Sequence, residues 1–190
     1  MKKVAFIGHR NLYFGAESVM FRVIKFLKVH NLSTSIIVLP KSKDDGFSSQ
    51  LKNENINDIK LSSYKLIGGG YLRCLLCLAY NAICLIELCP YLKSKKIDTV
   101  YSNTSVNILG AMISWVLGTS HIWHFHEQPT GGTFKWIPTK LFPIYRFFIR
   151  RRKTTIIFIS KVQKDLWEKE FDMGFIYSYY IQLQIRCTLF

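Results

Sequence analysis

Short apolar runs alternate along this chain with longer segments whose apolar residues recur at helical spacing. The first pair is typical, because Val4-Ala5-Phe6-Ile7 precedes a stretch with apolar residues at positions 19, 21, 23, 24 and 27. Such alternation predicts an α/β fold with a mostly parallel sheet and helices on both of its faces. The expected strands are residues 3–7, 35–39, 59–66, 98–101, 121–126 and 155–159, and the expected helices are residues 16–29, 72–93, 106–117, 136–150 and 161–171.

Glycine and proline mark where some of these elements end. Gly118 follows the helix at 106–117 and is expected to cap its C-terminus. Pro143 lies inside the helix at 136–150 and is expected to kink or split it. The polar stretch 41–58 is predicted to be a surface loop with one helical turn near residues 48–53, and Gly68-Gly69-Gly70 a flexible loop.

The length of 190 residues, with 49% hydrophobic residues, suits one domain with an ample core. We expect a single Rossmann-like domain over residues 1–171, followed by an atypical tail at 172–190. From 173 onward the tail carries one charge, Arg186, and many Ile, Tyr and Leu residues. Two interpretations of the tail stay open, an altered or interrupted reading frame and one last strand with a partner elsewhere.

The turn at residues 8–17 joins the first strand to the first helix and has the features of an anion-holding device. Glycine allows a ligand to approach the backbone closely, and the free N–H groups and dipole of a helix start favour phosphate. The turn lacks the G-x-G-x-x-G and G-x-x-x-x-G-K-[ST] patterns, so the simple dinucleotide and P-loop interpretations fail. The alternative is an ordinary first βα turn without a ligand.

Polar residues follow several of the expected strands. In an open parallel sheet, ligands bind at the carboxyl ends of the strands, so these residues mark the expected site. Strand alternation puts His124 and His126 on one side and Phe125 on the other. The residues at the strand ends are Gly8, His9, Ser102, Asn103, His124, His126 and Ser160.

The net charge of +14 predicts attraction to an anionic partner. Zinc-finger, RNP1 and GXXG patterns are absent, so nucleic acid is not the expected partner. Basic and aromatic residues interleave in and around the helix at 136–150, a pattern typical of helices in a membrane interface. The alternative is a helix packed on the sheet with solvated arginines. The residues assigned to this membrane surface are Lys135, Trp136, Arg146, Arg150, Arg151 and Arg152.

The most apolar segment, residues 71–92, has a longest charge-free stretch of 74–86, shorter than the roughly 20 residues of a spanning helix. We expect a buried or membrane-apposed helix. Its four cysteines are predicted to act as small hydrophobes, and no metal site is expected because they are spread along the helix. No signal peptide pattern is visible, which predicts reduced thiols and a cytoplasmic protein, peripheral at the inner face of the membrane.

Four stretches, in this order and spacing, resemble the N-terminal domain of the GT4-type, GT-B-fold glycosyltransferases, over about residues 3–170. Phe-Gly-Ala-Glu-Ser-Val at 14–19 resembles the family's Gly-Gly-Ala-Glu-Arg-Val turn, and Ile-Asp-Thr-Val-Tyr-Ser-Asn at 97–103 resembles its D-[IV]-[IV]-[HY]-[ST]-[HN] strand. Trp-His-Phe-His-Glu at 123–127 and Ile-Ile-Phe-Ile-Ser at 156–160 resemble its H-[DE] strand end and its [IV]-x-x-[IV]-S strand. Phe14 replaces the first glycine of the turn, and Ser18 replaces its arginine.

The resemblance implies two Rossmann-like domains with a cleft between them. The N-terminal domain of such enzymes binds the acceptor, and the C-terminal domain holds most of the nucleotide sugar. These enzymes usually retain anomeric configuration and need no metal or other cofactor. The donor domain and its Glu-x7-Glu motif are absent from this sequence, so the expectation is a truncated enzyme or one that needs a donor-domain partner on a second polypeptide.

Roles follow for individual residues by the same resemblance. Gly15 and Ala16 would face the donor phosphates, although Phe14 puts a bulky group where the diphosphate would approach. His126 would hydrogen-bond the donor sugar or the departing phosphate, and Glu127 would orient His126 or cap the next loop. For the remaining strand-end residues, local structural bonds are the alternative to substrate binding; these are Asn103, His124 and Ser160.

The sequence therefore predicts the acceptor-side half of a retaining glycosyltransferase that uses a nucleotide sugar in surface polysaccharide or glycolipid biosynthesis. A lipid-linked or saccharide acceptor at the inner membrane surface would suit the basic aromatic helix. The alternative is a membrane-peripheral, non-catalytic binding or scaffold protein with a Rossmann-like fold.

Overall fold

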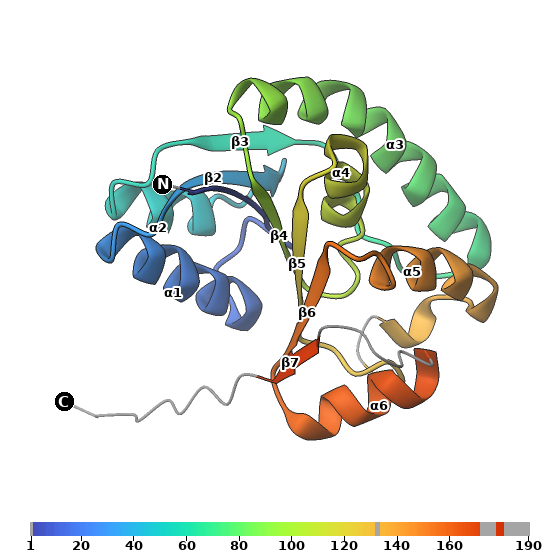
Figure 1. Ribbon diagram of the computed structural model, residues 1–190. Helices are drawn as coiled ribbons and strands as arrows, with labels where there is room; N and C mark the ends of the chain where they lie inside the picture. The colour runs from blue at the N-terminus through green and yellow to red at the C-terminus, as the bar shows by residue number, and fades with distance from the viewer. Residues whose placement is uncertain (1, 132–133, 172–177, 181–190) are drawn as a thin grey trace.

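The computed structural model describes residues 2–131, 134–171 and 178–180, and has the expected α/β architecture (Figure 1). Its strands pair in parallel, in the order β3-β2-β1-β4-β5-β6-β7. The strands are β1 (Lys2–Ile7), β2 (Ser33–Pro40), β3 (Ile59–Ser62), β4 (Thr99–Asn103), β5 (Ser120–Phe125), β6 (Thr154–Phe158) and β7 (Ser178–Tyr180). The α-helices are α1 (Gly15–Val29), α2 (Gly46–Asn53), α3 (Tyr71–Ser94), α4 (Leu109–Leu117), α5 (Phe142–Ile149) and α6 (Lys161–Phe171).

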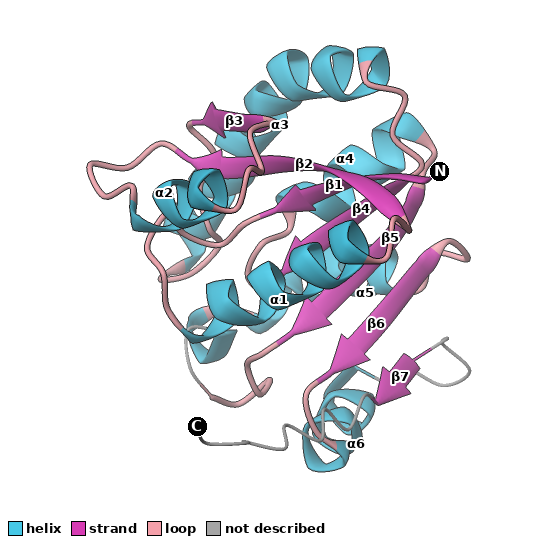
Figure 2. Cartoon of the chain, turned by 90° about the vertical axis from the view of Figure 1, so that its left-hand side faces the viewer, coloured by secondary structure: helices cyan, strands magenta, loops and turns pink. Residues whose placement is uncertain are grey.

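Helices cover both faces of the sheet (Figure 2). They can do so because successive buried residues of a strand point to opposite faces. On β1, Val4 and Phe6 pack in a cluster with residues of α1 and α2. Ala5 and Ile7 pack in a different cluster, with residues of α3 and α4. A third, aromatic cluster joins β5 and β6 to α5 and α6 on the latter face. The predicted single Rossmann-like domain is therefore observed.

The strand order reverses beside β1. From β1 the chain adds β2 and then β3 on one side, and after α3 it returns to add β4, β5 and β6 on the other. The crevice between β1 and β4 at the carboxyl edge of the sheet is the position at which such sheets bind ligands. The predicted strand-end residues therefore gather in the expected place.

The predicted helix at 136–150 is wrong as a single element. A 3-10 turn, η1 (Phe134–Trp136), is followed by a second, η2 (Thr139–Leu141), and then by α5. Pro143 does not split a helix, because it lies in the first turn of α5, where its missing N–H needs no partner. The interruption falls instead at Ile137-Pro138.

Other element boundaries differ by smaller amounts. Residues 46–53 form the full helix α2 rather than a single turn. The third strand ends at Ser62 rather than 66, and α4 begins at Leu109 rather than 106. Gly118 caps α4 in the left-handed conformation, with φ of 67°, as predicted.

The 24-residue helix α3 is long and apolar enough, by length and composition, to cross a membrane. In the fold, however, one of its sides packs on the core, with Asn81 and Leu88 fully buried. Cys74, Cys77, Cys84 and Cys89 lie on this packed side as free thiols, in the apolar role predicted for them. Cys187 lies outside the described residues.

The tail supplies the strand β7, which pairs with β6 through Ser178 and Tyr180 at its two ends. This pairing corresponds to the last-strand interpretation for residues 178–180. The reading-frame interpretation stays a prediction, and residues 172–177 and 181–190, with Arg186, lie outside the described part of the chain.

Candidate functional site

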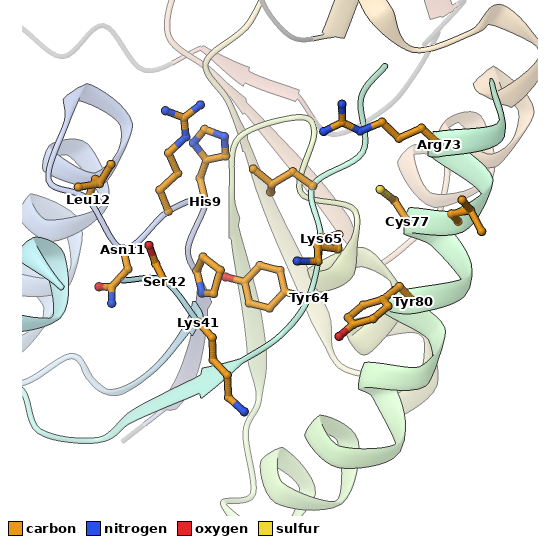
Figure 3. A pocket seen from close by; sticks show the side chains of 14 residues that line it. His9, Asn11, Leu12, Lys41, Ser42, Tyr64, Lys65, Arg73, Cys77 and Tyr80 are labelled. Atoms are coloured by element: carbon orange, nitrogen blue, oxygen red, sulfur yellow. The ribbon is translucent and has the colours of Figure 1, made fainter. Parts of the chain in front are cut away.

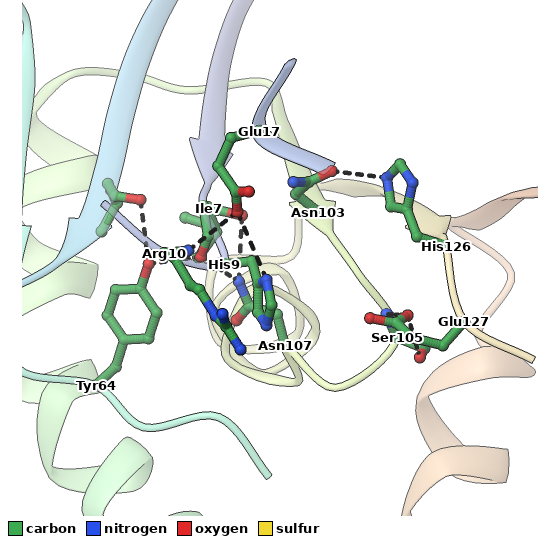
Figure 4. A network of polar contacts seen from close by, with 12 residues as sticks. Ile7, His9, Arg10, Glu17, Tyr64, Asn103, Ser105, Asn107, His126 and Glu127 are labelled. Carbon is green, nitrogen blue, oxygen red and sulfur yellow. Dashed lines mark hydrogen bonds and ion pairs between the residues drawn. The ribbon is translucent and has the colours of Figure 1, made fainter. Parts of the chain in front are cut away.

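At the end of β1, the backbone carbonyl groups accept hydrogen bonds from side chains of two other segments (Figure 4). Asn107 donates from Nδ2 to the carbonyl oxygens of Ile7 and Gly8, at 3.2 and 2.7 Å. The Tyr64 hydroxyl donates to the Gly8 carbonyl at 2.6 Å. These bonds turn the chain out of the sheet, so that the next residues line the crevice rather than extend the strand.

The turn after β1 is organised around Glu17, a carboxylate that is only 1% exposed. Its Oε1 accepts the Arg10 backbone N–H at 3.2 Å and lies 3.5 Å from His9 Nδ1. A buried carboxylate is costly unless it is paired, so these contacts fix the path of the turn. The role of Glu17 was not predicted, although an acidic residue on the apolar side of a helix's first turn is a recognisable signal.

The start of α1 is accessible. No side chain caps the helix, and Phe14 at the N-cap position is 59% exposed. Gly15 is exposed, and a Cβ placed on it would meet nothing within 4 Å, so open space lies beside its Cα. An uncapped helix start of this kind can accept an anion.

Asn103 and His126, predicted from separate motifs, are in contact. Asn103 lies at the end of β4 and His126 directly after β5, and His126 Nε2 is 2.9 Å from Asn103 Oδ1. With the amide in this orientation, His126 donates through Nε2–H. Burial lowers the pKa of His126, which opposes the smaller upward influence of Glu127 and Glu17, so the ring is neutral near pH 7. Such a ring can hydrogen-bond a ligand without carrying charge.

Asn103 also leaves a donor unpaired. Its side chain is completely buried, and its Nδ2 has no hydrogen-bond partner among the described residues. Buried donors are normally satisfied, because an unmade hydrogen bond costs about 1–3 kcal/mol. The Asn103–His126 pair is therefore the part of the strand-end cluster best placed to gain from a ligand that brings an acceptor.

His124 is engaged in the sheet. Its Nδ1 contacts the hydroxyl of Tyr101 on β4, and burial lowers the pKa of His124 to about 3. His121, earlier on β5, is bound in a similar way to Ser102 Oγ at 2.9 Å, and its pKa is also lowered to about 3. Both rings are neutral over the ordinary pH range, which suits the structural alternative for His124.

Glu127 and Ser160 stabilise loops beside the site. The Glu127 carboxylate accepts the backbone N–H and the hydroxyl of Ser105 at 2.9 and 2.7 Å. The carboxylate therefore holds the loop after β4, which is neither of the two roles predicted for Glu127, orienting His126 or capping the loop that follows. Ser160 Oγ accepts the Gln163 backbone N–H at 3.1 Å, which caps the start of α6.

The predicted membrane surface is divided between the two edges of the sheet. Trp136 lines a cavity with Arg10 and Arg73 at the carboxyl edge, and Lys135 Nζ lies 4.8 Å from the centre of the Trp136 ring. Arg151 and Arg152 lie three and two residues before the start of β6, and so at the opposite edge. Arg151 donates to Ser114 Oγ at 3.0 Å. The six residues do not form one continuous surface, because the single helix expected to carry them is interrupted; Arg146 and Arg150 are on or directly after α5.

A pocket that sequence analysis missed lies beside β1 and β2 (Figure 3). Its cavity volume is about 600 Å³, and α3 forms one wall. Four basic residues and no Asp or Glu line it; these are Arg10, Lys41, Lys65 and Arg73, in addition to His9. They come from three stretches of the sequence, at residues 10, 41 and 65–73, so no local motif contains all of them. Among the described residues, no group of three or more His, Cys, Asp or Glu side chains could hold a metal ion.

No protein-family model and no curated protein matches this chain. Several solved structures do. A glycosyltransferase from Rickettsia africae has a TM-score of 0.65 at 15% identity, over 95% of this chain and 42% of its own. MurG from Acinetobacter baumannii has a TM-score of 0.53 at 16% identity, over 83% of this chain and 41% of its own.

A plant protein is similar to this chain in the same way, with a matching fold at low sequence identity. UGT89C1 from Arabidopsis thaliana, solved in complex with UDP, has a TM-score of 0.57 at 8% identity, over 96% of this chain and 52% of its own. The chain thus spans about half or less of the length of these three structures. At such identities the likeness concerns the fold, which is that of a Rossmann-like domain found in glycosyltransferases.

Proposed function

We propose that this chain is the acceptor-side domain of a glycosyltransferase that uses a nucleotide sugar, of the GT4 type and retaining. In this proposal it acts in surface polysaccharide or glycolipid biosynthesis, in the cytoplasm at the inner face of the membrane. A donor-binding domain, on the same or another polypeptide, completes the cleft. The nucleotide sugar is a substrate, and the reaction needs no resident metal or cofactor.

One observation carries the proposal. In a fold shared with glycosyltransferases, the polar strand ends converge on the crevice beside the open start of α1. The unpaired Nδ2 of Asn103 and the N–H groups of Gly15 and Ala16 are hydrogen-bond donors at this edge, while Nδ1 of His126 is an acceptor. A nucleotide sugar offers the matching acceptors, its hydroxyl and phosphate oxygens.

In the reaction, Nδ1 of the neutral His126 ring would accept a hydrogen bond from a donor-sugar hydroxyl, because the Nε2–H is directed at Asn103. To bind an oxygen of the departing phosphate instead, the ring would have to release Asn103 and donate its Nε2–H to that oxygen. Fixed donors are most effective where charge develops in a site without water, and the second domain would exclude water by closing over the crevice. Phe14 occupies the helix start, so we expect the donor diphosphate to contact this turn less closely than in enzymes with a glycine there. His124, Glu127 and Ser160 would hold the surrounding loops and strands.

The alternative is a membrane-peripheral binding or scaffold protein without catalysis. The exposed apolar side of α3 and the net charge of +14 favour membrane attachment in either case. The two functions differ in their dependence on a sugar nucleotide. A scaffold would bind membranes equally with and without a nucleotide sugar, and would accompany no transfer.

Label transfer is the experiment that tests the proposal. The tagged chain is purified from its own cells with any donor-binding domain that is fused to it or co-purifies, then supplied with labelled sugar nucleotides and membrane lipids. We expect transfer by this complex and none by the recombinant chain alone, because half a cleft cannot position the transferring sugar. His126→Ala should lower kcat/KM by about 10²–10³-fold.

His30→Ala is the matched control, since His30 is an exposed histidine just after α1. It should leave both co-purification and transfer unchanged. Equal transfer by the two variants, or transfer by the recombinant chain alone, would contradict the proposed role of the crevice.

A further inference from the structure

All the charged residues that line the basic pocket beside β1 are positively charged. Arg10, Lys41 and Arg73 line it and form no ion pair with a carboxylate among the described residues. Two nearby carboxylates are engaged elsewhere. Glu17 is turned inward to the Arg10 backbone N–H and to His9. Glu87, whose charge interacts with that of Lys41, is paired directly with Lys60 at 2.7 Å. Gathered cations without a counter-charge produce a positive potential that attracts an anion, and arginine is suited to phosphate because it can donate two hydrogen bonds at once.

The fourth basic residue of the pocket is built into its wall. The Lys65 backbone is fixed to α3, because Asn81 Oδ1 accepts its N–H and Asn81 Nδ2 donates to its carbonyl, both at 2.8 Å. Its ammonium lies 5.7 Å from the centre of the Tyr80 ring. In Figure 3, Lys65 and Arg73 both project from the α3 side of the cavity. The pocket therefore has a fixed wall, from which exposed basic side chains extend.

One wall of the pocket continues into an exposed apolar stripe on α3. Leu76 and Tyr80 line the pocket. The stripe extends at helical spacing on either side of them, with Leu72 at 70%, Ile83 at 64% and Ile86 at 77% exposure. At 1.5 Å per residue, the distance from Leu72 to Ile86 is roughly 21 Å. An exposed apolar surface of this extent marks an interaction site.

The opposite side of α3 excludes a spanning orientation while the fold is intact. Asn81 is fully buried and holds the segment before α3, and Leu88 and Leu92 are packed in the core. A helix fixed along one side in this way can lie in a membrane interface but cannot cross the bilayer. Trp136, 61% exposed beside Arg10 and Arg73, is a residue type that prefers that interface.

We propose that this pocket binds the phosphate headgroup of a membrane lipid, while the Leu72–Ile86 stripe enters the bilayer beside it. The stripe requires an apolar partner and the pocket an anionic one, and a phosphate-bearing lipid joins both in one molecule. The inference rests on the proposed function only in taking this lipid to be the acceptor. Lipid binding itself needs neither a donor domain nor transfer.

Vesicle flotation tests the inference with the full chain. The vesicles are phosphatidylcholine alone, phosphatidylcholine with phosphatidic acid, and phosphatidylcholine with phosphatidylserine at matched charge. We expect the tightest binding to phosphatidic acid, whose terminal phosphate is exposed. The Arg10→Gln/Arg73→Gln double variant should weaken that binding about thirtyfold, since each basic residue near an anionic surface adds roughly 1 kcal/mol.

The stripe is tested by Ile83→Ser/Ile86→Ser, which should lower binding to every vesicle at least tenfold. Matched controls lie elsewhere on the surface, Arg22→Gln on α1 and Val162→Ser on α6, where Val162 is 65% exposed. Both controls should bind as the unaltered chain does. Circular dichroism melting checks that every variant is folded.

Three results would overturn the inference. Equal binding to all three vesicles, unchanged in the arginine variant, would leave the pocket without a role. Competition by inorganic phosphate, with no effect of the stripe variant, would make free phosphate the ligand. A dimer in sedimentation velocity that the stripe variant dissociates, without vesicle binding, would make a second copy the partner of α3. None of these results bears on label transfer, so failure of this inference is distinguishable from failure of the proposed function.

Discussion

The carboxyl edge of the sheet has two halves that treat polar groups in opposite ways. Beside β4 and β5, polar side chains are buried and mostly paired with one another, as in Tyr101–His124 and Ser105–Glu127. Beside β1, β2 and α3, basic side chains line an open pocket without carboxylate partners. In the β4–β5 half, the hydrogen bonds hold the strands and loops in place. In the β1–α3 half, the charged side chains are accessible to a ligand. Because they are hydrated, they lower the stability of the fold only slightly.

The Asn103–His126 pair lies where these two halves meet. It belongs to the buried network, yet Asn103 keeps one unpaired donor. The comparison therefore suggests a division of roles, with the β4–β5 half positioning the pair and the β1–α3 half binding the charged ligand. Changes in the first half should lower stability, and changes in the second should lower binding.

The largest effect is expected for Gly110→Ala in α4. A Cβ at this position would overlap Ser102 Oγ on β4, so helix and strand must separate. We expect a loss of about 3 kcal/mol in the free energy of unfolding, measured by urea denaturation. Gly15→Ala, at the open start of α1, is the control and should change it by less than about 0.5 kcal/mol. Equal effects would mean that α4 is not packed closely on β4.

The second-largest effect is expected from acidification, which should lower stability through the β4–β5 half. Burial lowers the folded-state pKa of His121 and His124 to about 3, whereas an unfolded histidine titrates near pH 6.5. As the pH falls from 7 to 5.5, the unfolded state takes up protons that the folded state does not. The free energy of unfolding should therefore fall, by roughly 2.5 kcal/mol for the two histidines together.

Urea denaturation at the two pH values measures this loss. His124→Gln should remove about half of it, because one of the two depressed histidines is gone. Stability that does not change with pH over this interval would show that the rings are not buried as neutral groups.

Asn107→Ala should have a somewhat smaller effect. It removes both hydrogen bonds from Nδ2 to the Ile7 and Gly8 carbonyls at the end of β1. We expect the free energy of unfolding to fall by about 2 kcal/mol in the same denaturation experiment. Asn53→Ala, an exposed asparagine at the end of α2, should change it by less than about 0.5 kcal/mol. If Asn107→Ala left the free energy of unfolding unchanged, the turn after β1 would have to be held by other contacts.

The smallest effect on stability is expected in the open half. Arg73→Gln removes an exposed cation, so the free energy of unfolding should stay within about 0.5 kcal/mol of the unaltered value. Binding to phosphatidic acid vesicles should nevertheless fall. If Arg73→Gln destabilised the chain as much as Asn107→Ala, the proposed difference between the two halves would be lost.

The sequence predicted the layered fold because the two periodicities of its apolar residues are distinct. It located Asn103 and His126 at neighbouring strand ends, but not their contact, which depends on the register between β4 and β5. The helix break at Pro138 was missed, since a proline in the first turn of a helix, like Pro143, and one between helices have similar sequence surroundings. The apolar segment of α3 gave no indication of which side would pack, because both sides are apolar.

The basic pocket was beyond sequence reasoning for a different reason. Arg10 and Arg73 are far apart in the chain and are brought together only by the strand order and by the path of α3. The membrane surface was assigned to residues adjacent in sequence, from Lys135 to Arg152. The fold separates Arg151 and Arg152 from Trp136, and it assembles a basic and apolar surface from Trp136 together with Arg10, Arg73 and α3.

The central claim is that the carboxyl edge of the sheet holds a lipid acceptor for glycosyl transfer. The most direct measurement is steady-state label transfer by the complex that carries this chain, with lipid and nucleotide sugar varied in turn, for the unaltered chain and for Arg10→Gln/Arg73→Gln. We predict that the variant raises the KM for the lipid at least tenfold and leaves the KM for the nucleotide sugar unchanged. Unchanged KM values for both substrates, or an effect on the nucleotide sugar alone, would contradict the account.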